Sequence, residues 1–147
     1  MKPYDAKAGE APRPADSISL SPELFGPGAR FHHVGMAVSD IEKAQPGAEI
    51  IINRTQGVAM AFVDWYGLRL EVLEPLDEDS PIFRGLREGQ KLLHLCFEVP
   101  KIETALEHAK SFGFHRISRP APTPEFDDRR IVWVFSKAFG LIELVEA

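Results

Sequence analysis

The stretch HVGMAVSDIEKA (His33–Ala44) recurs in the second half of the chain as HLCFEVPKIETA (His94–Ala105). The two stretches align without gaps at a distance of 61 residues, and five of their positions are identical: His, Val, Ile, Glu and Ala. A second pair, LEVLE (Leu70–Glu74) and IELVE (Ile142–Glu146), lies 72 residues apart. Such self-similarity indicates that one supersecondary unit occurs twice. The sequence therefore predicts a fold built from two copies of one module.

Each copy is predicted to contain a strand, a helix and three further strands. In the first copy the helix is capped by Asp40, and Pro46 ends it after little more than one turn. In the second copy apolar residues at helical spacing predict a longer helix over Ile102–Phe112, closed by Gly113. The second copy has 11 more residues between its landmarks, and we assign them to this longer helix. The predicted strands are 31–38, 49–53, 58–64 and 68–73, then 92–99, 114–118, 130–136 and 140–145.

The expected fold class is α+β, with two βαβββ modules in one domain. A Pro-rich N-terminal leader, residues 1–30, holds five of the 12 prolines, so it is expected to form no long helix and to be partly mobile. The predicted domain covers residues 31–147. It divides into a module at 31–75, a connector at 76–91 and a module at 92–147. Leu20, Leu24 and Phe25 are the leader residues expected to dock on the domain.

Composition excludes several classes of protein. The chain has 147 residues, of which 44% are hydrophobic and 27% charged, as in soluble globular proteins. We expect no membrane association, because no apolar run approaches the roughly 20 residues of a bilayer span. The net charge is −5 with both signs interspersed, which argues against a nucleic-acid partner. The single cysteine, Cys96, and the lack of an apolar secretory signal favour a cytoplasmic location.

The repeat also pairs residues that bind metals. His33 and His94 lie in the first strands of their modules, and Glu71 and Glu143 lie in the last strands. A carboxylate among apolar strand residues is costly unless it is paired or bound to a metal. Two imidazoles and two carboxylates suit a divalent transition metal such as Zn, Ni, Co, Mn or Fe. Surface histidines and exposed edge-strand glutamates are the alternative, but four residues matched by the repeat favour a metal site.

Other residues that carry chemistry are fewer. Cys96 lies on an apolar strand and is predicted to be part of the core rather than a nucleophile. The remaining histidines, His32, His108 and His115, are predicted to be surface residues. The sequence contains no glycine-rich phosphate loop, no Ser/His/Asp pattern and no paired-cysteine zinc motif.

FHHVGMAVSDI (Phe31–Ile41) resembles the opening strand of the vicinal oxygen chelate superfamily, which includes glyoxalase I, bleomycin-resistance proteins, extradiol dioxygenases and methylmalonyl-CoA epimerase. The resemblance covers about Phe31–Ala147. It implies that the paired modules curl into a mixed sheet, a cup, around a divalent metal. It further implies that the metal ligands are His33, Glu71, His94 and Glu143.

Within that superfamily the similarity is greatest to the methylmalonyl-CoA epimerases. The order of the segments LEPL (Leu73–Leu76), LHLCFEV (Leu93–Val99) and GLIEL (Gly140–Leu144) matches theirs. Two features depart from the epimerase pattern. Met60 stands where the epimerases have a second catalytic Glu, and the first-module helix is short. The epimerases also usually have Gln at the position of Glu71, where bacterial glyoxalase I has Glu.

The leading functional hypothesis is a metal-dependent lyase or isomerase that removes a proton next to a carbonyl, as methylmalonyl-CoA epimerase does. The expected base is Glu143, with Glu71 as the second candidate, and the expected substrate is a small carbonyl compound or an acyl-CoA. Met60 leaves open a non-catalytic binding or resistance protein, and a glyoxalase I-type isomerase is a further alternative. A dioxygenase is less favoured, because a fourth protein ligand crowds the iron. We also expect a homodimer that covers exposed sheet edges.

Overall fold

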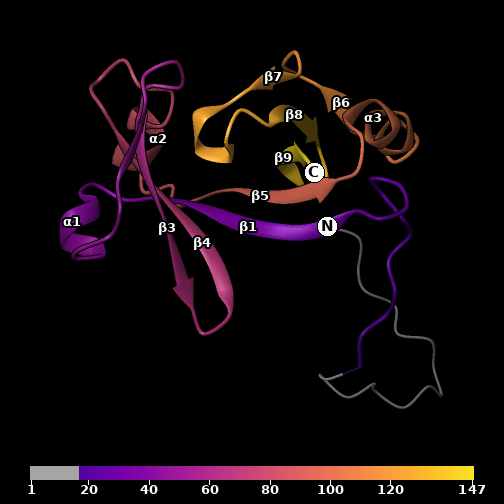
Figure 1. The fold of residues 1–147 in the computed structure, drawn as a ribbon, viewed down its shortest axis with the longest axis horizontal. Helices are drawn as coiled ribbons and strands as arrows, with labels where there is room; N and C mark the ends of the chain where they lie inside the picture. The colour runs from indigo at the N-terminus through magenta and orange to yellow at the C-terminus, as the bar shows by residue number, and fades with distance from the viewer. Residues whose placement is uncertain (1–16) are drawn as a thin grey trace.

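Nine strands within residues 17–147, the part of the chain that the computed structural model describes, form one mixed sheet (Figure 1). The first module contains β1 (Arg30–Ala37), α1 (Ile41–Ala44), β2 (Ile51–Asn53), β3 (Val58–Trp65) and β4 (Leu68–Pro75). A connector with α2 (Phe83–Arg87) follows. The second module contains β5 (Leu92–Val99), α3 (Ile102–Lys110), β6 (His115–Arg116), β7 (Ala121–Pro122), the 3₁₀ helix η1 (Pro124–Phe126), β8 (Arg130–Ser136) and β9 (Gly140–Glu146).

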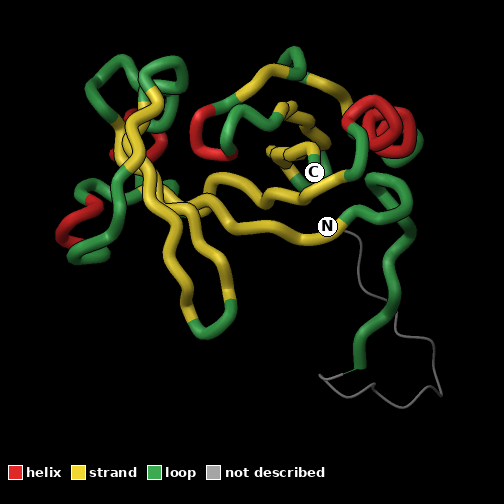
Figure 2. Tube along the Cα trace, viewed as in Figure 1, coloured by secondary structure: helices red, strands yellow, loops and turns green. Residues whose placement is uncertain are grey.

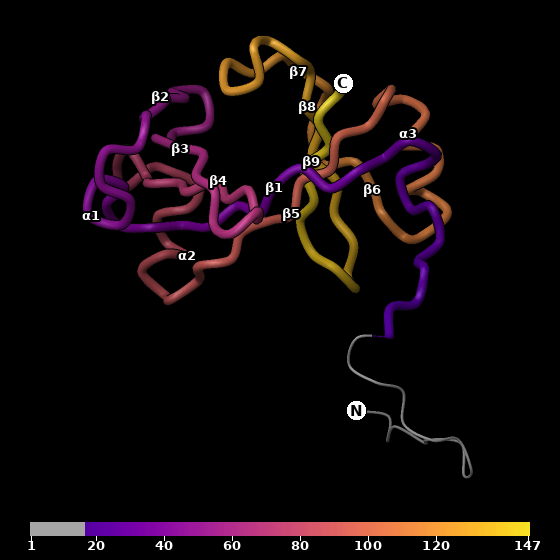
Figure 3. The backbone as a smooth tube through the Cα atoms, turned by 60° about the horizontal axis from the view of Figure 1, so that its bottom comes forward, coloured from indigo at the N-terminus to yellow at the C-terminus, as the bar shows by residue number. Residues whose placement is uncertain are grey.

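The strand order shows the repeat directly. It runs β2-β3-β4-β1-β5-β9-β8-β6, with β7 also paired to β8. The first strand of each module is parallel to the last strand of the same module, so β1 pairs with β4 and β5 pairs with β9. The two first strands are antiparallel neighbours at the centre. Figure 3 shows the consequence, two lobes joined where β1 and β5 cross. The predicted fold class and the two βαβββ modules are confirmed.

The helices explain only part of the difference in length between the modules. Helix α1 has four residues and α3 has nine, so the truncated first helix is confirmed. The prediction that all the extra residues lie in the second helix is wrong, because the rest of them lie between α3 and β8, where β7 and η1 have no counterpart in the first module. Figure 2 shows α1 and α3 at opposite ends of the molecule. Within residues 17–147, no helix has the length and apolar character that a membrane span requires.

Each module buries its own apolar core beneath its helix. Leu70 and Val72 of β4 pack with Ile41 of α1, whereas Ile142 and Leu144 of β9 pack beneath α3. Successive side chains of a strand point to opposite faces of the sheet. The glutamates between these core residues therefore point to the other face, the inside of the cup.

Part of the predicted leader belongs to the packed structure. Phe25 is buried in the second-module core, where its ring lies 5.2 Å from the rings of both Phe97 and Phe114. The predicted docking of Phe25 is confirmed, whereas that of Leu20 is wrong, because 98% of its surface is exposed. The rest of the leader, residues 1–16, lies outside the described residues, so its mobility stays a prediction.

Candidate metal centre

The structure brings together the four residues that the repeat pairs. His33, Glu71, His94 and Glu143 each offer a ligand atom, and these atoms all lie within 4.8 Å of one another. All four side chains are buried. They come from β1, β4, β5 and β9, the four central strands of the sheet. The pseudo-twofold arrangement of the modules therefore places equivalent side chains face to face.

The imidazole nitrogens and carboxylate oxygens of these residues lie within hydrogen-bonding distance of one another, and most of them are acceptors. The Nε2 atoms of His33 and His94 lie 3.1 Å apart. Oε2 of Glu71 lies 3.1 Å from Nε2 of His33 and 3.3 Å from Nε2 of His94. Oε2 of Glu143 lies 3.4 Å from Nε2 of His94. Two imidazole nitrogens and two carboxylates that converge in a buried place form a donor set for a cation.

Glu143 shows most clearly that a cation fits this centre. Among the described residues, its Oε1 atom is buried without a hydrogen-bond partner. Burial, followed by the charges of Glu71 and Glu125, raises the pKa of Glu143 well above its usual value. A buried carboxylate oxygen without a partner is costly in free energy, and a positive ion supplies the partner. The side chains present therefore fit a divalent metal.

Glu71 lies in a different electrostatic environment, although it is the repeat partner of Glu143. Burial favours its protonated form, but hydrogen bonds from His33 and His94 outweigh burial and lower the pKa of Glu71 to about 2. The carboxylate of Glu71 is therefore already satisfied by imidazoles on both sides.

Two small residues on the central strands make room for the imidazoles. Gly35 of β1 lies opposite His94 of β5, and a Cβ atom at Gly35 would overlap the His94 ring. Cys96 of β5 lies opposite His33. Burial raises the pKa of the Cys96 thiol far above its usual range. The prediction that Cys96 belongs to the core is confirmed.

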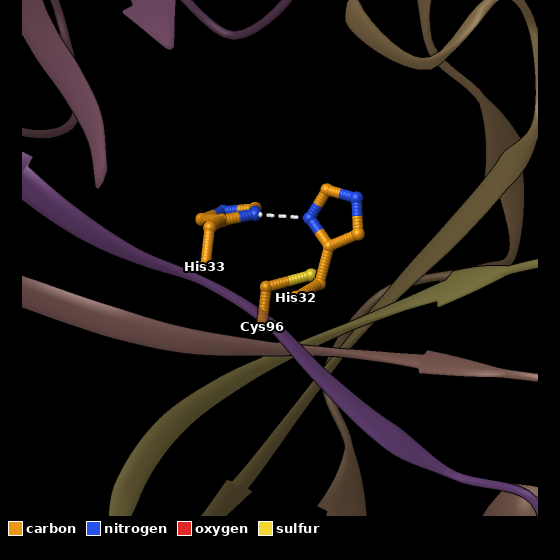
Figure 4. Close-up of side chains that lie close together, drawn as sticks. All are labelled: His32, His33 and Cys96. Carbon is orange, nitrogen blue, oxygen red and sulfur yellow. Dashed lines mark hydrogen bonds between the residues drawn. The ribbon is translucent and has the colours of Figure 1, made fainter. Parts of the chain in front are cut away.

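His32 is a site residue that the sequence did not reveal. A bulge between Phe31 and His33 places the His32 ring beside that of His33, as Figure 4 shows. The Nδ1 atoms of the two rings are 2.8 Å apart, and Nη1 of Arg69 lies 2.8 Å from Nε2 of His32. Burial, with the nearby charges of His33 and Arg69, lowers the pKa of His32 to about 4.

The prediction that His32 is a surface residue is therefore wrong. Strict alternation would turn His32 away from His33, and the bulge is what brings both rings to one face. The only hint in the sequence is the His-His doublet itself. Of the other two histidines, His115 is exposed as predicted, whereas His108 is half-buried.

A cavity of about 780 Å³ lies beside His94. Its walls are mainly apolar and include Leu73, Leu93, Trp133 and Leu141. Trp133 meets the His94 ring edge-on, with the ring centroids 4.8 Å apart. An apolar cavity next to converging polar groups is the usual form of a small-molecule site.

Met60 supports the wall of this cavity. Its side chain is fully buried and packs in a cluster with Val58 and Leu73, which themselves line the cavity. The first module therefore places a thioether, which cannot transfer a proton, behind an apolar wall.

The segment β7–η1 covers the other side of the centre. The ring of Phe126 stacks on His33, with centroids 5.9 Å apart and planes 27° apart. Asn53 at the end of β2 donates hydrogen bonds to Glu125 at 3.0 Å and to Thr123 at 3.4 Å. These bonds tie the second module to the first. No pattern in the sequence predicted that β7 and η1 cover the centre, although Pro124 is a typical first residue of a helical turn.

Comparisons with known proteins identify the superfamily of this chain. A sequence model of the Glyoxalase/Bleomycin resistance protein/Dioxygenase superfamily matches residues 32–133. Mitochondrial methylmalonyl-CoA epimerase of Homo sapiens is 31% identical over an alignment that covers 96% of this chain and 85% of that protein. Ethylmalonyl-CoA/methylmalonyl-CoA epimerase of Cereibacter sphaeroides is 29% identical and covers 78% of this chain and 96% of that protein.

The fold of this chain is also similar to that of a solved epimerase structure. The crystal structure of methylmalonyl-CoA epimerase from Mycobacterium tuberculosis matches with a TM-score of 0.65 and 27% identity. The match covers 79% of this chain and 86% of that one. The superfamily resemblance seen in the sequence is confirmed.

Proposed function

Because this chain belongs to the glyoxalase/bleomycin resistance/dioxygenase superfamily, we propose that it is a metal-dependent isomerase that epimerises 2-substituted malonyl thioesters. The observation that carries the proposal is the buried group of two imidazoles and two carboxylates beside an apolar cavity. The substrate class comes from the relatives, which are named as epimerases of methylmalonyl-CoA and ethylmalonyl-CoA.

His33, Glu71, His94 and Glu143 are the residues that would hold the metal. The donor set suits Zn, Ni, Co, Mn or Fe, because it mixes imidazole nitrogen with carboxylate oxygen. When bound, a divalent ion supplies a Lewis acid that polarises carbonyl oxygens and so makes the adjacent C–H more acidic.

Glu143 is the residue that we propose as the base. Its Oε1 atom has no hydrogen-bond partner among the described residues, and its Oε2 atom lies 3.4 Å from Nε2 of His94. Glu71, the second candidate, is engaged by both imidazoles and is less free to move. A base must reach the proton that it removes and must have a pKa near the working pH, and the environment of Glu143 raises its pKa in that direction.

The proton therefore leaves carbon 2 of the substrate for a carboxylate oxygen of Glu143. Met60 offers no second proton donor on the wall of the first module. Epimerisation then requires either that the planar deprotonated substrate turns within the cavity before Glu143 returns the proton, or that a water molecule donates a proton to the opposite face while Glu143 releases its own proton to solvent. Leu93 and Leu141 of the cavity wall would offer an apolar surface to the alkyl substituent of the substrate.

The test is exchange of the carbon-2 proton with solvent deuterium. Methylmalonyl-CoA and ethylmalonyl-CoA are incubated in D₂O with the metal-loaded protein, the chelator-treated protein and the Glu143→Gln variant. Mass spectrometry should show deuterium uptake with the loaded native protein alone. Stabilisation of the loaded protein by either thioester without deuterium uptake overturns the proposal and identifies a binding protein instead.

We also propose a homodimer in the cytoplasm. The edge strand β2 and the residue before it leave Ile50 and Ile52 exposed at 43% and 46%, and covering such an edge favours self-association. The cytoplasm suits a chain whose single cysteine, Cys96, is free and buried. Sedimentation velocity that finds only a monomer contradicts the first statement, and cell fractionation tests the second.

A further inference from the structure

A line of hydrogen bonds runs from the protein surface to the candidate metal centre. Arg69 on β4 is exposed, and its Nη1 atom lies 2.8 Å from Nε2 of His32. Nδ1 of His32 lies 2.8 Å from Nδ1 of His33. Nε2 of His33 lies 3.1 Å from Oε2 of Glu71. Neither Arg69 nor His32 belongs to the proposed set of ligands.

The chemistry of the guanidinium group decides the direction of every bond in this line. Arginine donates hydrogen bonds and accepts none, so Nε2 of His32 must carry no proton. The proton of a neutral His32 then lies on Nδ1 and is donated to Nδ1 of His33. His33 must accept at that atom, so its own proton lies on Nε2, directed at Glu71.

This arrangement opposes metal binding. A nitrogen that binds a metal must be free of its proton, and the second nitrogen of the ring normally donates its N–H to a neighbouring acceptor. For His33 to bind through Nε2, its proton must move to Nδ1 and be donated to His32. His32 would then carry its proton on Nε2, where it would face the N–H of Arg69.

We propose that Arg69, acting through His32, holds His33 in the tautomer that cannot bind a metal, so that metal binding requires Arg69 to leave His32. His32 is a positioning residue in this scheme, because it fixes the ring of His33 and determines which of its nitrogens carries the proton. Arg69 is an opposing residue whose removal raises the metal affinity. The inference rests on the metal centre of the proposed function.

The surroundings allow Arg69 to move. It lies at the edge of a hollow of about 330 Å³ that is also lined by Arg30, His32 and Glu98. Nε of Arg30 donates to Glu98 at 2.9 Å, and Nη1 of Arg129 donates to the same carboxylate at 2.9 Å. Glu98 therefore holds those two arginines, while Arg69 has His32 as its side-chain partner among the described residues.

The second module lacks this line of hydrogen bonds. At the repeat distances, His32 corresponds to Leu93 and Arg69 corresponds to Leu141. Both leucines line the apolar cavity instead. The tautomer of His94 is therefore free of such control, and the opposition to metal binding acts on His33 alone.

The test is the affinity of the full chain for Co²⁺, measured by competition with a coloured chelator. Arg69→Met should raise the affinity by about tenfold, because it removes one hydrogen bond that favours the unreactive tautomer. Arg30→Met is the matched control, since it removes one positive charge from the same hollow but leaves His32 in place. His32→Leu should lower the affinity by roughly 10- to 100-fold through loss of the ring orientation.

His32→Asn should retain most of the affinity, because the Asn amide can accept the N–H of His33. An Arg69→Met affinity equal to that of Arg30→Met, or below that of the native protein, overturns the inference. Thermal unfolding of each variant shows whether the variant is folded.

A second measurement does not depend on metal binding. Side-chain ¹⁵N chemical shifts of the metal-free protein report which nitrogen of each histidine carries the proton, and His33→Gln identifies the His33 signals. His33 should carry its proton on Nε2 in the native protein and shift toward Nδ1 in Arg69→Met. A proton on Nδ1 of His33 in the native protein overturns the inference, whereas failure to bind Co²⁺ at all overturns the proposed metal centre.

Discussion

The two modules place equivalent imidazoles in unlike surroundings. Beside His33, the residues at positions 32 and 69 are polar, since the His32 ring bonds that of His33 and Arg69 bonds His32. The neighbours of His94 at the corresponding repeat positions are Leu93 and Leu141, which line the cavity. The proposed control of a metal ligand therefore lies in the first module alone, whereas the equivalent positions of the second module belong to the cavity wall.

The two glutamates diverge in the same way. Glu71 is held by two imidazoles and keeps a low pKa, whereas Glu143 has an oxygen without a partner among the described residues and a raised pKa. Of the two carboxylates that we propose as metal ligands, Glu143 is therefore the one that we also propose for proton transfer.

The largest expected effect comes from replacing Glu143, and the same replacement at Glu71 is the comparison. Glu143→Gln should reduce deuterium exchange into a malonyl thioester by about 10²- to 10⁴-fold, the usual contribution of a positioned acid or base. Glu71→Gln should mainly weaken metal binding and recover most of its exchange rate at saturating metal. Exchange rates measured across metal concentrations distinguish the two variants. Equal losses at saturating metal would contradict the division of roles.

The next effect concerns the space for the imidazoles. Gly35→Ala should destabilise the protein by about 1–3 kcal/mol and displace the His94 ring, because the added Cβ overlaps that ring. The matched change at the equivalent position, Cys96→Ala, removes atoms instead of adding them, so it should leave His94 in place. Urea unfolding and Co²⁺ affinity measure both effects. A Gly35→Ala variant with native metal affinity would show that the central strands adapt more than expected.

The third prediction is a dependence of stability on pH in the metal-free protein. The pKa of Glu143 is raised above its usual 4.5, so the native state binds more protons than the unfolded state above that pH. The free energy of unfolding should therefore fall as the pH rises from 4.5 through the raised pKa of Glu143.

Glu71 has the opposite sign, because its pKa is lowered to about 2, and its contribution to stability should be lost as the pH falls toward that value. Urea unfolding from acidic to neutral pH measures both trends. Glu143→Gln should abolish the decline on the alkaline side and be more stable than the native protein at neutral pH. A decline that persists in Glu143→Gln would assign it to another group.

The smallest expected effect is at Met60, which compares the cavity wall of the first module with Glu143, the proposed base of the second. Met60→Leu should cost less than about 1.5 kcal/mol and leave the exchange rate within a few-fold of native, since the side chain only packs behind Val58 and Leu73. Exchange kinetics and urea unfolding measure these effects. A large loss of exchange at native stability would show that Met60 contacts the substrate.

Much of the fold and the centre could be predicted from the sequence because the two halves of the chain can be aligned with each other. The repeated stretches at His33–Ala44 and His94–Ala105 located the first strands and the two histidines. The paired segments around Glu71 and Glu143 located the last strands. The apolar residues around each carboxylate made a charge there costly, which favoured a bound metal.

The remaining features depend on contacts between distant parts of the chain. The bulge that turns His32 toward His33 results from the shift in register between β1 and β5. Arg69, the hydrogen-bond partner of His32, comes from a third strand, β4. The cover over the centre depends on Phe126 meeting His33. Local patterns of burial do not encode such pairings.

The sequence by itself determined the duplicated module, the four converging side chains and the superfamily. Only the tertiary structure decided which glutamate is free, which histidine is controlled by a neighbour and where the apolar cavity lies. The physical reason is that periodicity reports how often a side chain is buried, whereas a pKa or a tautomer depends on the identity of the groups that surround it. Glu71 and Glu143 have nearly the same local sequence but different partners in space.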